Sequence, residues 1–239
     1  MGQIVCEWGL NGIEAFRSTA AVFVIVDVLS FSTAVSVAVD RGAEVIPFPW
    51  GDPEAAQQEA KRRGAVAASP KRAAGQQLSL SPASLRQVSL GTRLLLPSPN
   101  GSRLSLATGE TPTYCACLRN FGAVAGAVRD TVQAGSIGVI PAGERWGDGS
   151  LRPAIEDWIG AGAVIAALGG EVSSEALAAR LAYEAVRSDL APMIRGSISG
   201  RELIDRGFAE DVEIALEVGQ SRCAPRLRDG SYREGLLTR

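Results

Sequence analysis

The sequence predicts a three-layer α/β fold, in which helices cover both faces of a mostly parallel sheet. Short apolar runs alternate with helical runs of small residues, and capping or turn residues separate them. This alternation requires crossover connections, which are typical of parallel strands. The length of 239 residues, with 46% hydrophobic and 21% charged residues, suits a folded chain with one large domain or two small ones that share a core.

Five apolar runs are the predicted strands. Each is short and dominated by Val, Ile, Leu, Ala, Phe, Tyr or Cys, as expected for strands with both faces buried. The runs cover residues 21–28, 44–48, 93–96, 114–118 and 136–140.

Capping residues mark two of the helices between these strands. Asp52 followed by Pro53 is a typical helix start, and Gly64 is expected to end that helix. Asn120 is placed to cap a second helix over residues 121–133.

The last third of the chain predicts further helices over residues 150–168 and 174–186. The segment Ser199–Glu202 matches the S-x-x-E capping box, which places Arg201 in the first turn of another helix. Residues 229–230, an Asp-Gly pair, predict a turn between two short extended runs.

Composition excludes several classes of function. The net charge of -2 offers no basic stripe, so we expect no nucleic-acid partner. The apolar run at residues 20–29 contains Asp27 and is too short for a bilayer, so we expect a cytoplasmic protein with no membrane partner. Because the chain has no histidine, its chemistry must use carboxylates, hydroxyls, Arg, Lys or an oxygen-ligated metal such as magnesium.

The first candidate site follows the strand at residues 21–28. Asp27 stands at its carboxyl end, and Ser30, Ser32 and Thr33 come directly after it. Ligands of open α/β sheets bind at this edge, near helix N-termini that favour anions. Taken alone, Asp27 is equally a helix cap or a catalytic group.

The second candidate is the run from Asn100 to Arg103, after the strand at residues 93–96. Its glycine turn would expose backbone N–H groups, Ser102 offers a hydroxyl, and Arg103 can neutralise phosphate with a bidentate fork. An Asn-Gly pair is also typical of a hairpin, and on spacing alone we expect a hairpin turn here.

Two more strand-to-helix junctions carry polar groups. Asn120 is more often a cap than a ligand at such a place. Glu156 and Asp157 follow a loop that begins at Ala142 and Gly143. Since adjacent helical residues face different directions, at most one of the two carboxylates points into a given site.

In their order along the chain these segments resemble the 2-phosphosulfolactate phosphatase family, from about Val22 to the turn at residues 229–230. The matching segments are Asp27-Val28-Leu29 with Ser32-Thr33, Asn100-Gly101-Ser102-Arg103, Asn120 before Ala123-Val124-Ala125, Ala142-Gly143, Glu156-Asp157 with residues 160–163, and Gly200-Arg201 with Gly207-Phe208 and Asp211-Val212. The resemblance implies a magnesium-dependent phosphatase that hydrolyses a phosphate monoester of a short sulfonated hydroxy acid. It also implies an α/β/α fold of two similar, intertwined halves, within a single unit over residues 1–239.

The chain also departs from the family's pattern. The family commonly has Arg where this chain has Ser30, and Thr residues where residues 97–99 stand. Its Gly-Glu-Arg element is not recognisable near residues 71–75. Since Arg pairs with phosphate and sulfonate, its loss would alter the anion site. A non-catalytic binder of a small phosphorylated or sulfonated anion is therefore an alternative to the phosphatase, with Ser30 as its main support.

From these residues we expect the following division of roles. Asp27 and one of Glu156 or Asp157 bind Mg²⁺, and water is the expected nucleophile, with attack by Asp27 or Ser32 as alternatives. The expected partner is a small-molecule phosphate ester, and the sequence leaves open whether the chain forms a homo-oligomer. The remaining predicted site residues are Arg103 and Asn120 as catalytic groups, and Ser30, Ser32, Thr33, Asn100, Gly101, Ser102 and Arg201 as substrate-binding groups.

Overall fold

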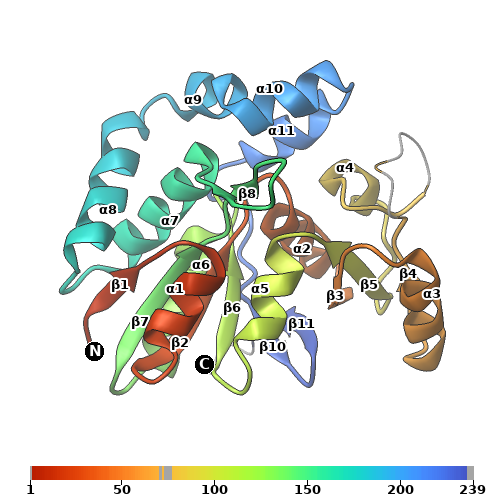
Figure 1. Ribbon diagram of the computed structural model, residues 1–239, viewed down its shortest axis with the longest axis horizontal. Coiled ribbons are helices and arrows are strands. Elements are labelled where there is room, and N and C mark those ends of the chain that lie inside the picture. Colours follow the sequence, from red (N-terminus) through yellow and green to blue (C-terminus); the bar gives the residue numbers. More distant parts are fainter. Residues whose placement is uncertain (1, 70–71, 73–76, 236–239) are drawn as a thin grey trace.

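The structure, a computed structural model, describes residues 2–69, 72 and 77–235 (Figure 1). It confirms the predicted α/β class, because a large, mostly parallel sheet runs through the molecule and helices pack on both of its faces. None of the helices in these residues has the length and apolar character needed to span a bilayer.

Nine strands of the described chain form the main sheet, in the spatial order β1-β7-β2-β6-β10-β11-β3-β5-β4. Their bounds are β1 (Ile4–Cys6), β2 (Ala20–Val26), β3 (Glu44–Pro49), β4 (Val66–Ala67), β5 (Arg93–Ser98), β6 (Thr113–Ala116), β7 (Ser136–Pro141), β10 (Pro225–Arg228) and β11 (Ser231–Glu234). A separate small hairpin consists of β8 (Glu144–Arg145) and β9 (Leu151–Arg152).

The helices alternate with the strands through most of the chain and follow one another in its last third. Their bounds are α1 (Gly9–Phe16), α2 (Phe31–Asp40), α3 (Pro53–Arg62), α4 (Pro82–Leu85), α5 (Gly101–Ala107), α6 (Phe121–Thr131), α7 (Ile155–Leu168), α8 (Ser174–Val186), α9 (Leu190–Gly196), α10 (Ile198–Asp205) and α11 (Ala209–Ala215).

The main sheet consists of two parallel parts that run in opposite directions. Strands β1, β7, β2 and β6 are parallel to one another, and so are β3, β5 and β4. The hairpin of β10 and β11 joins the two parts through three successive antiparallel pairings. Three reversals of direction leave β3 and β5 antiparallel to β2 and β6, a relation that the alternation of strands and helices does not reveal.

Alternating side chains of each strand explain the layers. In β2, Val22, Val24 and Val26 pack with α6, α7 and α8 on one face, whereas Phe23 and Ile25 pack with α1 and α5 on the other. A strand that buries both faces has no polar side to reveal its orientation, so its sequence reads as a continuous apolar run. Figure 1 shows α1 and α5 crossing in front of these strands.

The second part of the sheet is covered in the same way. Val45 and Leu94 pack with α2 and α4 on one face of β3 and β5, and Ile46 and Leu95 pack with α3 on the other. The chain forms β1 and β2 in the first part of the sheet, then β3, β4 and β5 in the second part, and returns to the first part with β6 and β7. This path interleaves the two parts, while the predicted similarity of the two halves stays a prediction.

Most of the elements agree with the sequence analysis, and three local predictions are wrong. The helix expected from residue 150 begins at Ile155, because Leu151 and Arg152 form β9. The N-cap of α10 is Ser197, whose hydroxyl accepts a hydrogen bond from the backbone N–H of Gly200 at 2.9 Å, so the expected capping box at Ser199 is two residues out of register. Asn100 and Gly101 do not form a hairpin turn, because they connect β5 directly to α5. The Asp-Gly turn at residues 229–230 is confirmed as the link between β10 and β11.

Candidate active site

The carboxyl end of β2 meets the carboxyl end of β5 at Asp27. One carboxylate oxygen of Asp27 accepts a hydrogen bond from the backbone N–H of Phe31 at 3.0 Å, and the other accepts from the backbone N–H of Gly101 at 2.9 Å. Two parallel strands would bring these ends together at one edge, but β2 and β5 run antiparallel. The two parts of the sheet are turned relative to each other, as Figure 1 shows, so both carboxyl ends face the same site.

The turn between β2 and α2 is fixed by its own hydroxyl groups. Ser32 Oγ accepts a hydrogen bond from the Asp27 N–H at 3.0 Å and donates to the carbonyl of Ile25. Thr33 Oγ1 donates to the carbonyl of Val28 at 2.7 Å. Both side chains are fully buried. The hydroxyls predicted to bind substrate therefore hold the backbone that presents Asp27.

A cavity of about 460 Å³ opens beside Asp27. It is large enough for a small organic ester, and it contains both acidic and basic groups. The lining residues are Asp27, Leu29, Ser30, Trp50, Arg72, Leu80, Ser98, Pro99, Asn100, Glu144 and Arg206.

The acidic end of this cavity consists of Asp27 and Glu144. Asn100 Nδ2 donates a hydrogen bond to Glu144 Oε2 at 2.8 Å, which fixes Glu144 beside the β5–α5 junction. Burial raises the pKa of Asp27 to about 6, against the opposing effect of its two N–H donors. Burial, together with the charge of Asp27, raises the pKa of Glu144 to about 7. Both carboxyls therefore change their charge near neutral pH.

The pair Glu156 and Asp157 lies in the first turn of α7, behind the cavity wall. Asp157 accepts hydrogen bonds from the backbone N–H of Val28 at 2.7 Å and of Gly143 at 2.9 Å, one on each oxygen. It thus ties the loop after β2 to the loop after β7. Burial and the charges of Asp27 and Glu156 raise the pKa of Asp157 well above its usual range. Neither residue lines the cavity.

The basic end of the cavity was missed by sequence reasoning. Arg72 donates to Asp211 Oδ2 at 2.6 Å and to Ser30 Oγ at 2.8 Å, and Arg206 lines the same cavity. Arg72 is the one described residue in the segment 71–75, where the family's Gly-Glu-Arg element was expected, and the other residues of that segment lie outside the described residues. Its distance in sequence from Ser30 left no local pattern that could reveal the contact.

Of the predicted site residues, only Asp27, Ser30 and Asn100 line this cavity. Arg103 is exposed and lines a neighbouring cavity of about 270 Å³, which shares Pro99, Asn100 and Glu144 with the first. Ser102 is buried and donates its hydroxyl to the carbonyl of Leu96 at 2.8 Å. The structure therefore brings Asn100 and the Gly101 N–H to Asp27 but turns the two side chains that follow elsewhere.

Asn120 and Arg201 also lie outside the cavity. Asn120 Oδ1 accepts from the backbone N–H of Cys117 at 2.9 Å, and its Nδ2 donates to the carbonyl of Cys115, so this buried side chain closes the end of β6. Arg201 is exposed and donates to the carbonyl of Gly196. The cavity is lined instead by Arg206, one residue beyond the end of α10.

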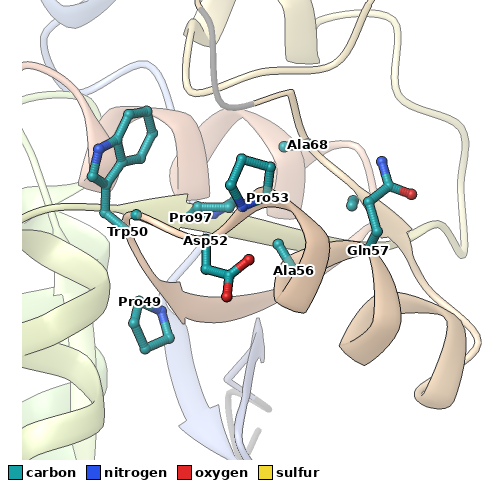
Figure 2. Close-up of a pocket in the computed structure, with 10 residues that line it drawn as sticks. Pro49, Trp50, Asp52, Pro53, Ala56, Gln57, Ala68 and Pro97 are labelled. Carbon is teal, nitrogen blue, oxygen red and sulfur yellow. The ribbon is translucent and has the colours of Figure 1, made fainter.

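A smaller cavity of about 130 Å³ lies next to the first, between α3 and the ends of β3 and β5 (Figure 2). Trp50 lines both cavities, and prolines and alanines form most of the smaller one's remaining wall. Its carboxylate, Asp52, accepts a hydrogen bond from the Ala55 N–H at 2.9 Å and so caps α3. With that group engaged, the smaller cavity offers no cluster of charged groups for chemistry.

Within the described part of the chain, no three Asp, Glu or Cys side chains are grouped as a ready metal-binding cluster. Mg²⁺, however, is commonly held by one or two carboxylates, with water and substrate phosphate filling its other positions. Asp27 and Glu144 supply carboxylate oxygens to the cavity wall, and the charge of Asp27 raises the pKa of Glu144. Such a pair, made of hard oxygen donors that repel each other, fits a divalent cation.

Comparison with known proteins identifies the family of this chain. Residues 11–230 match the 2-phosphosulpholactate phosphatase family. The 2-phosphosulfolactate phosphatase of Methanothermobacter thermautotrophicus is 34% identical over 211 residues, which cover 87% of this chain and 87% of the relative. The family match includes every residue that lines the cavity. The chain therefore belongs to the 2-phosphosulfolactate phosphatase family, a family of phosphoric monoester hydrolases.

Proposed function

We propose that this protein hydrolyses the phosphate monoester of a small acidic hydroxy acid, 2-phosphosulfolactate or a closely related compound, and that it does so with Mg²⁺. One observation carries the proposal: a buried carboxylate, Asp27, is held by two backbone N–H groups at the wall of a cavity that also contains two arginines. The family match gives the class of ester, and the cavity gives the place where it would bind.

Asp27 and Glu144 are the residues that would hold Mg²⁺. The fixed position of Asp27 supports this role, because each of its oxygens uses one lone pair for an N–H and keeps another free. Glu156 adds negative charge behind Asp27 but does not line the cavity. Each oxygen of Asp157 also accepts one N–H, but Asp157 does not line the cavity either. When bound, the ion would neutralise charge on the phosphoryl group and activate water for attack.

The other residues of the cavity would orient the ester. Arg72 and Arg206 attract its negative charge, and Asn100 holds Glu144 in place through its side-chain amide. The half-buried walls reduce access of bulk water, which strengthens each of these charge interactions. Water supplies the oxygen that replaces the ester oxygen on phosphorus, and the products are inorganic phosphate and the free hydroxy acid.

The alternative of a non-catalytic anion binder loses its main support at Ser30. Arg72 donates a hydrogen bond to Ser30 Oγ, so a guanidinium reaches the position at which the sequence appeared to lack one. An anion-binding cation is therefore present at this wall of the cavity, although it comes from another segment of the chain.

The test is phosphate release from 2-phosphosulfolactate by the wild type and by Asp27→Asn, each with Mg²⁺ and with EDTA. Removing a carboxylate that contacts metal and substrate should lower kcat by about 100-fold or more, and EDTA should abolish the wild-type activity. Asp52→Asn is the matched control, because Asp52 caps α3 outside the cavity and Asn is an equally good cap. Equal turnover in Asp27→Asn and wild type would exclude the proposed role of Asp27, and anion binding without any turnover would favour the binder.

A further inference from the structure

The cavity has two ends of opposite charge. Asp27 and Glu144 accept hydrogen bonds from Gly101 and Asn100 at the start of α5, which defines one end. Arg72, held by Asp211 and Ser30, lies near Arg206 at the other end, and it is close enough to Asp27 to attract its charge. An anionic group is repelled by the two carboxylates unless a cation lies between them, whereas it can bind the arginines directly. The two ends are therefore suited to different parts of one ligand.

Arg72 is fixed more firmly than a surface arginine. Its guanidinium donates to Asp211 and to Ser30 Oγ, and it lies over the ring of Phe208 at 5.9 Å. Its side chain is 12% exposed, and that of Asp211 is 1% exposed. A planar cation held on three sides presents its remaining donors in one direction, at little cost in side-chain entropy.

Asp211 is itself held by groups that do not reach the cavity. Its Oδ1 accepts from Ser81 Oγ at 2.5 Å and from the Ala83 N–H at 3.1 Å, while its Oδ2 pairs with Arg72. Asp211 does not line the cavity. It therefore acts on any bound ligand through Arg72, as a positioning residue.

The positive charge at this end exceeds the negative charge that balances it. Asp211 neutralises one guanidinium, and none of the ion pairs among the described residues includes Arg206. Burial lowers the pKa of Arg72, Asp211 and then Asp27 oppose this effect, and the like charge of Arg206 adds to it. Two nearby cations of which one is paired directly with a carboxylate favour the binding of an anion between them.

We propose that Arg72 and Arg206 bind an acidic group of the substrate that is not transferred, a sulfonate or carboxylate, and that Asp211 positions Arg72 for this contact. The assignment rests on the proposed function, because it divides one ester between the two ends of the cavity. The phosphoryl group binds at the end with Asp27 and Glu144, and the acidic end of the carbon skeleton binds at the arginines. Arg72 and Arg206 thereby determine specificity for acidic esters over neutral ones.

Two esters separate these contacts. In glycerol 2-phosphate, a hydroxymethyl group replaces the carboxylate of 2-phosphosulfolactate and a hydroxyl group replaces its sulfonate, while the phosphate stays on the same secondary oxygen. In Arg206→Gln, we expect kcat/KM for 2-phosphosulfolactate to fall about 10- to 100-fold, mainly through KM. For glycerol 2-phosphate, kcat/KM should change by less than about threefold, because this ester has no carboxylate or sulfonate that Arg206 could bind.

Arg187→Gln is the matched control, because Arg187 is exposed at the end of α8 and does not line the cavity. Both esters should react with this variant as with the wild type. If Arg206→Gln lowers kcat/KM equally for the two esters, the arginines bind the transferred phosphoryl group and the proposal is wrong.

The role of Asp211 is tested with Asp211→Asn and Asp211→Glu. We expect Asp211→Asn to raise KM for 2-phosphosulfolactate about tenfold with kcat little changed, and Asp211→Glu to recover part of the loss. Because Asp211 also holds Ser81 and Ala83, the thermal midpoint of each variant is measured in parallel. Arg72→Lys keeps the charge but loses the fork, and should show the same rise in KM in a fully folded protein. An unchanged KM in Arg72→Lys would overturn the assignment.

Binding without turnover separates this proposal from the proposed function. Calorimetry with 3-sulfolactate and with inorganic phosphate measures both affinities. Arg206→Gln should lower the affinity for 3-sulfolactate about tenfold and the affinity for phosphate by less than about threefold. If the wild type hydrolyses no ester but gives this pattern, the proposed function fails and the arginine site stands. If the wild type hydrolyses the ester but the variant binds both anions as the wild type does, the arginine site fails and the proposed function stands.

Discussion

The carboxylate of Asp27 accepts a hydrogen bond from the backbone N–H of Gly101, which lies 74 residues further along the chain. Asp27 follows β2 and Gly101 begins α5 after β5, so this bond joins the two oppositely directed parts of the sheet. It also places the N-terminus of α5 against the carboxylate, where the helix dipole favours negative charge. The geometry of the site therefore depends on the close approach of these two backbone segments.

The first prediction concerns the space at Gly101. A Cβ atom at this position would overlap the buried ring of Phe31. Since Phe31 packs edge-on against Tyr232 in the core, the ring cannot move aside freely. We expect Gly101→Ala to lower the free energy of unfolding by about 1–3 kcal/mol and to reduce activity by displacing the donor to Asp27.

Urea unfolding with Gly122→Ala as control checks this expectation. A Cβ on Gly122, in α6, would meet nothing within 4 Å. That variant should keep its activity and gain about 0.4–1 kcal/mol of stability, because alanine restricts the unfolded chain. Equal stability in the two variants would mean that the contact between α5 and Phe31 is not tight.

A second prediction separates a clamp from a metal ligand at Asp157 and Glu144. Asparagine has one acceptor oxygen in place of two, so Asp157→Asn leaves the N–H of Val28 or of Gly143 without its partner. We expect it to lower the free energy of unfolding by about 1–3 kcal/mol, while Mg²⁺ affinity falls by less than about threefold.

Glu144→Gln should behave in the opposite way. Glutamine still accepts the hydrogen bond from Asn100 Nδ2, so stability is kept, but the site loses a charge and its Mg²⁺ affinity should fall about tenfold or more. Calorimetric Mg²⁺ titration and urea unfolding of both variants decide the matter. A large loss of Mg²⁺ affinity in Asp157→Asn, at unchanged stability, would return Asp157 to the metal ligands.

A third prediction follows from the raised pKa values of Asp27 and Glu144. In the metal-free protein these pKa values are about 6 for Asp27 and about 7 for Glu144, above the usual values of 3.8 and 4.5. Between its usual and its raised pKa, each carboxyl binds a proton more tightly in the folded state than in the unfolded state. Stability contributed by the protonated forms is complete below about pH 4 and is lost as the pH rises to about 7. We expect the thermal midpoint of the metal-free protein to fall across this window.

Magnesium should reverse this loss. Because the ion binds the ionised carboxylates, protons compete with it, and its affinity should rise between about pH 5.5 and 7.5. The stabilisation by a fixed Mg²⁺ concentration should be correspondingly larger at the higher pH. The depressed pKa of Glu44, about 2 through its hydrogen bonds with Arg93, Ser231 and Arg233 against the opposing effect of burial, acts at lower pH and does not disturb the window. Midpoints that stay level with pH, and a magnesium effect independent of pH, would contradict the assignment of both carboxylates.

The sequence was sufficient for the five strands β2, β3, β5, β6 and β7 and for the junction at Asp27, because apolar runs determine buried strands locally. It did not reveal the shorter strands β1, β4, β8 and β9. Local patterns do not contain the direction of one part of a sheet relative to another. That direction depends on the hairpin of β10 and β11, which pairs the end of the chain with β6 and β3. The same limit explains why the Asn-Gly pair at residues 100–101 suggested a hairpin rather than a helix start.

Pairs of charged residues from distant segments could not be predicted from the sequence, for a related reason. Arg72 lies between stretches without clear periodicity, and its partners Ser30 and Asp211 are far from it in the chain. Asp211 belonged to a segment that resembled the family, yet no spacing indicated which cation it would hold. Arg206 follows Arg201 by little more than one helical turn. Only the position of α10 relative to the cavity determines that Arg206 lines it and Arg201 does not.

The last prediction concerns Asn120, which the sequence suggested as a catalytic group. Its amide bonds the Cys117 N–H and the Cys115 carbonyl within the end of β6, and the side chain is fully buried. Asn120→Ala would leave both backbone groups without these partners, so we expect a loss of about 1–3 kcal/mol in the free energy of unfolding. At a temperature low enough for Asn120→Ala to stay folded, its KM and kcat should lie within about threefold of the wild-type values, because Asn120 does not line the cavity. Steady-state kinetics and urea unfolding on the same preparation test both halves of this expectation. A drop of about 100-fold in kcat at unchanged stability would place Asn120 in contact with the reacting groups, and would require the end of β6 to open toward the cavity when substrate binds.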